Sequence, residues 1–254
     1  MSALALDFDG VLCDSVAETA ATAWRAGAGL WSDIVGPMPP DPLLAGYRLA
    51  RPVVETGYEA ILVMRLLLDG VDPAELIAGY RDLAAGALAD SGRDVDGLKA
   101  LFSETRDRWL AEDPGEWASL SPFYPGIAEW MKGIPAGADC AIVTTKERRF
   151  VERLLDANTI PTPPGGIYGL EQGRAKESIL LDLIERSRGR TLCFVEDRLA
   201  TLERCLVRPD LSALAPRLAG WGYNTEADRQ RAERLGIPVW GPDDLFAFFA
   251  VERA

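Results

Sequence analysis

Histidine is absent from this chain of 254 residues. A Ser-His-Asp or Cys-His catalytic device, a histidine general base and a zinc site that needs imidazole are therefore excluded. Basic residues are also in deficit, with 27 Lys and Arg against 39 Asp and Glu and a formal net charge of −12 near pH 7. Because clustered Lys and Arg bind phosphate backbones and anionic headgroups, we expect neither nucleic acid nor a membrane as a partner. The available chemistry is that of carboxylates, lysine, hydroxyls, thiols and bound metal ions.

Cysteines are few, and no long hydrophobic run is present. None of the four cysteines forms a CxxC pair, and we expect all of them to be reduced thiols in a cytoplasmic protein: Cys13, Cys140, Cys193 and Cys205. Asp7 and Asp9 interrupt the N-terminal apolar run, which argues against a signal peptide. The most apolar stretch, residues 61–68, is too short to span a bilayer and contains Arg65.

The length predicts one large domain, or one domain with a smaller insert. Apolar residues make up 48% of the chain and charged residues 26%, as in an ordinary globular protein. Four apolar runs predict buried strands, at residues 3–9, 139–144, 191–195 and 237–240. Apolar residues at helical spacing lie between these runs, for example Phe150, Val151, Leu154 and Leu155, and again from Ile179 to Ile184. This alternation predicts an α/β fold with a doubly wound parallel sheet.

Residues 16–121 interrupt the alternation of strands and helices. They show helical spacing and Ala- and Leu-rich segments but no convincing strand, which predicts an inserted helical domain. A proline-rich linker is expected at 35–42, and residues 121–126 return the chain to the main domain. We therefore predict a core of residues 1–15 and 122–254 and a helical insert of residues 16–121. Further along, Trp221-Gly222-Tyr223 is interpreted as the end of a later strand, without a chemical role.

Four carboxylates lie at the ends of two predicted strands. Asp7 and Asp9 end the first strand, and Glu196 and Asp197 end the third. Ligands bind beyond the carboxyl ends of the strands in open parallel sheets, so these side chains are candidates for a site. Because like charges repel unless a cation compensates them, oxygen ligands at this density point to Mg²⁺.

Hydroxyls and one lysine complete the set of candidate residues. Thr144 and Thr145 end the second predicted strand, and Lys176 precedes the helix that leads into the third. Donors and a fixed positive charge beside a metal suit a phosphoryl group. Lys146 is an alternative to Lys176 as the lysine that contacts phosphate.

Four segments, taken in chain order, resemble the sequence motifs of the haloacid dehalogenase superfamily. They are Asp7-Phe8-Asp9-Gly10-Val11 followed by Asp14-Ser15, the strand that ends at Thr144, Lys176 before a helix, and Glu196-Asp197 after an apolar strand. The resemblance covers about residues 1–15 and 122–254. The helical insert resembles the cap domain of the subgroup that includes phosphoglycolate phosphatase and β-phosphoglucomutase.

The resemblance implies a mechanism through an aspartyl-phosphate. Asp7 corresponds to the nucleophile, and Asp9 to the acid that protonates the leaving oxygen and later deprotonates water. Mg²⁺ would be held by Asp7, the backbone carbonyl of Asp9, Glu196 and Asp197. Thr144 and Lys176 would hold the phosphoryl group. Dehalogenases of this superfamily lack an acid two residues after the nucleophile, so Asp9 points to phosphate esters.

Substrate selection is expected in the insert and around the nucleophile. The substrate-binding candidates are Gly10, Thr145, Arg51 and Glu55. Arg51 and Glu55 lie around Pro52, just before an apolar helix, where a loop could face the active site. A solvated helix entry explains the same charges equally well.

The sequence therefore predicts a Mg²⁺-dependent phosphatase, a monomer or homodimer, that acts on a small phosphorylated metabolite. A phosphomutase, which passes the phosphoryl group to another hydroxyl of its substrate, fits the same motifs. A catalytically idle binding or regulatory protein on this fold is the third possibility. Arg198 and Thr201, which depart from the commonest pattern of the fourth motif, are its only support.

Overall fold

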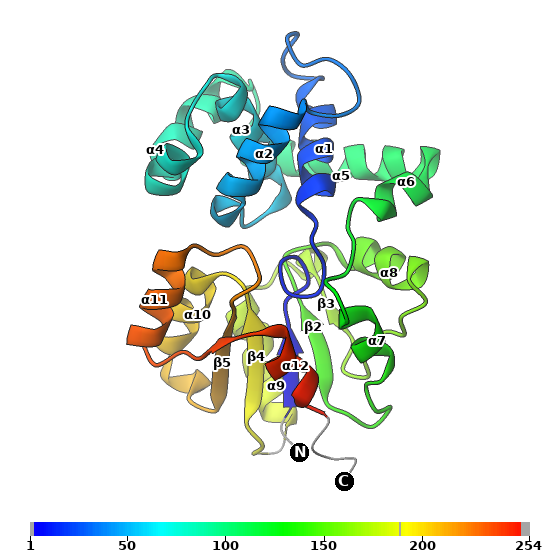
Figure 1. Ribbon diagram of the computed structural model, residues 1–254, viewed down its shortest axis with the longest axis vertical. Coiled ribbons are helices and arrows are strands. Elements are labelled where there is room, and N and C mark those ends of the chain that lie inside the picture. The colour runs from blue at the N-terminus through cyan, green and yellow to red at the C-terminus, as the bar shows by residue number, and fades with distance from the viewer. Residues whose placement is uncertain (1–2, 188, 250–254) are drawn as a thin grey trace. The chain divides into compact units, whose positions relative to one another are not determined.

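The computed structural model describes residues 3–187 and 189–249. The chain divides into two compact units. One consists of Met1–Asp14 and Pro122–Ala254 and contains the sheet, and the other, Ser15–Ser121, consists of helices (Figure 1). The predicted fold class, an α/β fold with an inserted helical segment, is confirmed.

The sheet of the first unit has six strands, all parallel. They are β1 (Ala3–Leu6), β2 (Cys140–Val143), β3 (Ile167–Tyr168), β4 (Leu192–Glu196), β5 (Leu214–Ala219) and β6 (Val239–Trp240). Their order in the sheet is β3-β2-β1-β4-β5-β6. The chain thus builds outward from β1 in one direction, returns, and continues from β4 in the other. The boundary between β1 and β4 is the topological switch point, where open parallel sheets bind ligands.

Helices cover both faces of this sheet. They are α7 (Ile127–Lys132), α8 (Arg148–Ala157), α9 (Lys176–Arg186), α10 (Leu199–Leu206), α11 (Glu226–Arg234) and α12 (Pro242–Ala247). In Figure 1, α12 lies in front of the sheet and α9 behind it. Side chains of α9 and α10, including Ile179, Leu180 and Leu202, pack with Phe194 of β4 in one buried apolar cluster.

The structure differs from the predicted strands in several places, and the strand predicted at 237–240 begins only at Val239. The first strand ends at Leu6 and not at residue 9, because the Phe8 carbonyl accepts N–H bonds from the turn that follows, including that of Leu12. The two-residue strand β3 was not predicted, since two residues are too few to show a period. β5 ends at Ala219, two residues before the predicted strand end at Trp221.

The second unit consists of α1 (Val16–Gly27), α2 (Asp41–Ala50), α3 (Gly57–Leu68), α4 (Pro73–Asp90), α5 (Val95–Glu112) and α6 (Pro114–Ser119), with a 3₁₀ turn at Arg51–Val53. Residues 15–121, all of them described, contain no strand. The predicted linker at 35–42 extends too far, because α2 begins at Asp41 and accommodates Pro42 in its first turn. Among the described helices, none combines the length and the low charge that a bilayer crossing requires.

A buried ion pair joins the first and fifth helices of this unit. The Arg106 guanidinium donates to both carboxylate oxygens of Glu18, at 2.7 and 2.6 Å. Glu18 is fully buried, and it also accepts hydrogen bonds from the Thr22 hydroxyl at 2.8 Å and the Trp117 indole at 3.0 Å. A buried charge is tolerated only when its hydrogen bonds are satisfied in this way.

We expect Arg106→Met to lower the free energy of unfolding by about 3–5 kcal/mol, because it leaves the buried Glu18 carboxylate without its counter-charge. The double variant Glu18→Gln/Arg106→Met should recover part of the loss. Urea unfolding measures both, with Arg108→Met, an exposed arginine on the same helix, as the control. An Arg106→Met protein as stable as the control would contradict a stabilising role for this pair.

Candidate active site

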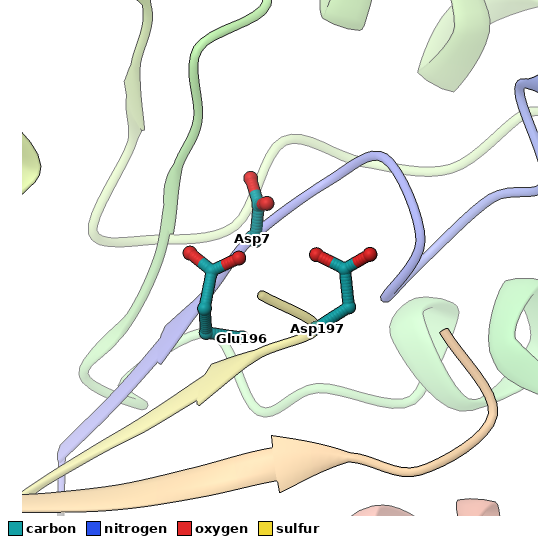
Figure 2. Close-up of side chains that lie close together, drawn as sticks. All are labelled: Asp7, Glu196 and Asp197. Carbon is teal, nitrogen blue, oxygen red and sulfur yellow. The ribbon is translucent and has the colours of Figure 1, made fainter. Parts of the chain in front are cut away.

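Three buried carboxylates converge at the carboxyl ends of β1 and β4. Asp7 follows β1, Glu196 is the last residue of β4, and Asp197 comes next. One oxygen from each side chain lies within 4.8 Å of the other two, and Figure 2 shows the three groups on the same side of the strand ends. The parallel register brings them together, because Leu6 pairs with Val195 and the Asp7 N–H donates to the Val195 carbonyl at 2.9 Å.

Lys176, the first residue of α9, bridges two of these carboxylates. Its ammonium nitrogen Nζ lies 3.0 Å from Asp7 Oδ2 and 2.8 Å from Glu196 Oε2. Glu196 Oε1 accepts the backbone N–H of Arg198 at 3.1 Å. One buried lysine therefore faces a cluster of three buried carboxylates.

Burial and mutual repulsion make this cluster unfavourable when it is fully ionised. Burial, reinforced by the charge of Glu196, raises the pKa of Asp7 to about 7 in spite of Lys176. Burial also raises the pKa of Glu196, against the opposing effect of Lys176. Burial alone would lower the pKa of Lys176, but Asp7 and Glu196 together raise it. Lys176 is therefore held as a cation, and it compensates the carboxylates only in part.

Asp9 has a different partner. Its Oδ1 lies 3.0 Å from the ammonium nitrogen of Lys146 and accepts a longer contact, 3.8 Å, from the Cys13 thiol. Asp9 is not a member of the three-carboxylate cluster. The group of Asp9 predicted to bind the metal ion is its backbone carbonyl, and this role stays a prediction. The two lysines that the sequence offered as alternatives thus contact different aspartates.

The two threonines follow β2, which neighbours β1 in the sheet. Thr144 is buried; its N–H donates to the Tyr168 carbonyl at 3.0 Å, and its hydroxyl accepts the N–H of Lys146 at 3.1 Å. Thr145 is partly exposed. Their predicted roles, phosphoryl contact for Thr144 and substrate binding for Thr145, stay predictions.

Close packing of three loops fixes the orientation of Asp197. Gly10 has a φ of +83°, and a Cβ there would lie 2.1 Å from Asp197 Oδ2, so only glycine fits. Gly222 is equally confined, since its Cβ would lie 2.4 Å from both Asp197 Cβ and the Gly10 carbonyl oxygen. The Tyr223 N–H donates to Asp197 Oδ2 at 2.8 Å, and its hydroxyl donates to Asp14 at 3.1 Å. Packing explains Gly10, and its predicted contact with substrate stays a prediction.

The loop at 221–224 is the part of the site that sequence reasoning missed. We interpreted Trp221-Gly222-Tyr223 as the end of a later strand without a chemical role, but Gly222 packs against Asp197 and the Tyr223 N–H donates to it. The Asn224 amide also donates to the Asp197 carbonyl at 3.1 Å. The only sequence signal was a glycine between two aromatic residues directly after an apolar stretch.

Arg51 and Glu55 belong to the helical unit. Arg51 is buried and donates to the Val54 carbonyl at 2.9 Å. The Glu55 N–H donates to Glu59 at 2.6 Å, in the turn that opens α3. Both residues thus have local structural contacts, and their role toward a substrate stays a prediction.

Comparison with known proteins supports the fold assignment. No family model and no curated relative matches the sequence, but solved structures match it over nearly its full length. A "predicted phosphatase" from Clostridium acetobutylicum superposes with a TM-score of 0.58 at 16% identity, covering 97% of both chains. A "haloacid dehalogenase-like family protein" from Streptococcus pneumoniae superposes with a TM-score of 0.56 at 14% identity, covering 98% of both chains. A "predicted phosphoglycolate phosphatase" from Haemophilus somnus superposes with a TM-score of 0.54 at 16% identity, covering 89% of this chain and 88% of the other.

The chain has the haloacid dehalogenase-like fold. The resemblance inferred from the four motifs is thereby confirmed for the fold. Within this fold, the first motif follows β1, the second follows β2, the third begins α9 and the fourth begins at the last residue of β4. These four element ends lie on both sides of the switch point.

The residues of the carboxylate cluster suit a divalent cation. Mg²⁺ prefers oxygen ligands and is bound in proteins by one or two carboxylates together with substrate phosphate. Asp7, Glu196 and Asp197 offer carboxylate oxygens, and burial raises the pKa of Asp7 and of Glu196 in spite of Lys176, so their ionised forms are disfavoured without a further cation. The fit of the donor set supports a metal site at the carboxyl end of β4.

We expect Asp7→Asn to stabilise the metal-free protein, and more so at high pH. The folded-state pKa of Asp7, about 7, lies above its ordinary value of 3.8. The folded state thus retains a proton that the unfolded state loses, and ionisation of Asp7 destabilises the fold as pH rises toward 7. The gain in stability from Asp7→Asn should be about 2 kcal/mol larger at pH 8 than at pH 5.5.

Thermal unfolding in chelator at both pH values measures this difference as a shift of several degrees in Tm. Asp243→Asn, at an exposed carboxylate, is the control. An equal gain at both pH values, or a loss at pH 8, would contradict the assignment of a raised pKa to Asp7.

Proposed function

We propose that this protein is a Mg²⁺-dependent phosphatase that hydrolyses a small phosphomonoester through a phosphorylated Asp7. One observation carries the proposal. Carboxylates that are far apart in the sequence, Asp7 and the Glu196-Asp197 pair, meet with Lys176 at the switch point of the sheet. The fold, shared with solved structures described as phosphatases, supports the same reaction class.

In the first step, a carboxylate oxygen of Asp7 attacks phosphorus. A bond forms between Asp7 and phosphorus while the bond from phosphorus to the leaving oxygen breaks. Asp9, two residues further along the same loop, gives its proton to that leaving oxygen. The products are the free alcohol and phospho-Asp7, with Asp9 now ionised.

In the second step, water attacks the phosphorus of phospho-Asp7. Asp9 takes a proton from this water, the bond between Asp7 and phosphorus breaks, and inorganic phosphate leaves. Asp7 is again a carboxylate and Asp9 is again protonated. Carboxylates can perform both steps, which agrees with a chain that has no histidine.

The other candidate residues would bind the phosphoryl group, the metal ion or the rest of the substrate. Lys176, already bound to Asp7, would neutralise oxygens of the phosphoryl group, and Thr144 would donate its hydroxyl to one of them. Asp7, Glu196 and Asp197 would hold Mg²⁺, which when bound would offset the negative charge between nucleophile and phosphate. Gly10 and Thr145 would contact the substrate, and Arg51 and Glu55 in the helical unit would select it.

We expect hydrolysis of para-nitrophenyl phosphate and of small alkyl phosphates with Mg²⁺, and none in chelator. Asp7→Asn should lower kcat by about 10⁴-fold or more, since it removes the nucleophile. Asp243→Asn should retain full activity. Intact-mass spectrometry of acid-quenched enzyme should show a phosphoryl adduct that Asp7→Asn lacks.

Turnover that survives chelation or Asp7→Asn would reject the mechanism. Transfer of phosphate to a second hydroxyl of a sugar phosphate, with no inorganic phosphate released, would instead identify a phosphomutase. An absence of turnover on every phosphoester would favour a binding or regulatory protein.

A further inference from the structure

Lys146 is a second buried lysine in the site, and the mechanism above does not use it. Its side chain is fully buried, and its ammonium nitrogen lies 3.0 Å from Asp9 Oδ1. Burying an ammonium group is unfavourable unless a counter-charge accepts its hydrogen bonds. The Asp9 carboxylate supplies that charge, and its Oδ1 can still accept the Lys146 hydrogen bond when the other oxygen, Oδ2, carries the proton for the leaving group. The position of Lys146 and that of Asp9 therefore depend on each other.

The backbone around Lys146 is held on both sides. Its N–H donates to the Thr144 hydroxyl at 3.1 Å, and its carbonyl accepts the Leu170 N–H at 3.2 Å. Gly169 packs so closely on this segment that a Cβ would lie 2.9 Å from the Lys146 carbonyl oxygen. The lysine therefore projects toward Asp9 from a fixed base, unlike a surface lysine that samples many rotamers.

Asp9 needs such a fixed partner. It lies in the turn after β1, where its side chain is 16% exposed, whereas Asp7 is tied to Lys176 inside the cluster. A proton donor must be held within hydrogen-bond reach of the oxygen that it protonates. The contact between Lys146 and Oδ1 fixes the rotation of the Asp9 carboxyl group about its side-chain bonds.

We propose that Lys146 is a positioning residue that orients Asp9 toward the leaving oxygen of the substrate. This inference rests on the proposed phosphatase function. The two buried lysines then have separate tasks, since Lys176 serves the nucleophile and Lys146 serves the proton donor. In this role, Lys146 would contact Asp9 and not the phosphoryl group.

Substrates with different leaving groups distinguish a positioning role of Lys146 from phosphate binding or a structural role. An alkyl alcohol leaves only when it is protonated, whereas para-nitrophenolate leaves without a proton. We expect Lys146→Met to lower kcat for an alkyl phosphate by about 10²-fold, the effect of a small misplacement of a catalytic group. The kcat for para-nitrophenyl phosphate should fall less than about threefold if phosphorylation of Asp7 limits turnover, and KM for both should stay within about threefold.

A double-mutant cycle tests whether Lys146 acts through Asp9. Asp9→Asn/Lys146→Met should lose no more activity toward the alkyl phosphate than Asp9→Asn alone, because the residue being positioned is already absent. Lys146→Arg, which keeps the charge, should restore part of the activity. Single-turnover measurement of the alcohol released in the first step avoids any effect on hydrolysis of phospho-Asp7.

Lys132→Met is the matched control, since Lys132 forms an ion pair with Glu129 on the surface of the same unit. Circular dichroism and Tm establish that each variant folds; if Lys146→Met does not, Lys146→Gln takes its place. Equal loss on both leaving groups in the single-turnover measurement would overturn the positioning role and indicate a structural one. A rise in KM for every phosphoester would overturn it in favour of direct phosphate contact.

The outcomes distinguish this inference from the proposed function. If the wild type hydrolyses both substrates with Mg²⁺ and Lys146→Met shows no leaving-group preference, the phosphatase stands and the positioning role fails. If the wild type hydrolyses neither substrate, both fail.

Discussion

The structure depends on one electrostatic constraint, which is the burial of three carboxylates beside Lys176. Asp7, Glu196 and Asp197 lie at the ends of two central strands, and Lys176 pairs with the first two. Such an arrangement is unfavourable by itself, as the raised pKa of Asp7 shows. It becomes favourable when a divalent cation adds positive charge, and so the instability of the cluster is what supports a binding function.

The topology explains why these residues meet although Asp7 and Glu196 are far apart in sequence. The chain returns across β1 to add β4 beside it, which places two strand ends at one switch point. Three surrounding loops then restrict the carboxylates. Gly10 and Gly222 allow the close approach, and Tyr223 supplies a backbone N–H to Asp197. The fold thus both brings the three carboxylates together and fixes their orientation.

The sequence predicted the parts of this picture that are local or periodic. The apolar runs at residues 3–9, 139–144 and 191–195 indicated β1, β2 and β4, although the first run extends beyond the observed strand, and spacing indicated α8 and α9. The two-residue strand β3 carried too little pattern to detect. Pairings between distant residues, such as Asp9 with Lys146 and Asp197 with Tyr223, could not be predicted, because they depend on how loops pack once the sheet has formed. Two candidate lysines could therefore be found from the sequence, but not the aspartate that each of them contacts.

Calorimetric titration of Mg²⁺ at pH 7, in two buffers that differ in ionisation enthalpy, tests the central claim most directly. The account predicts one site, with proton release on binding because the cation favours the ionised form of Asp7. Binding should weaken strongly in Asp197→Asn and stay unchanged in Asp243→Asn. Absence of binding in the wild type, or equal affinity in Asp197→Asn, would contradict the claim that the buried carboxylates form a cation site.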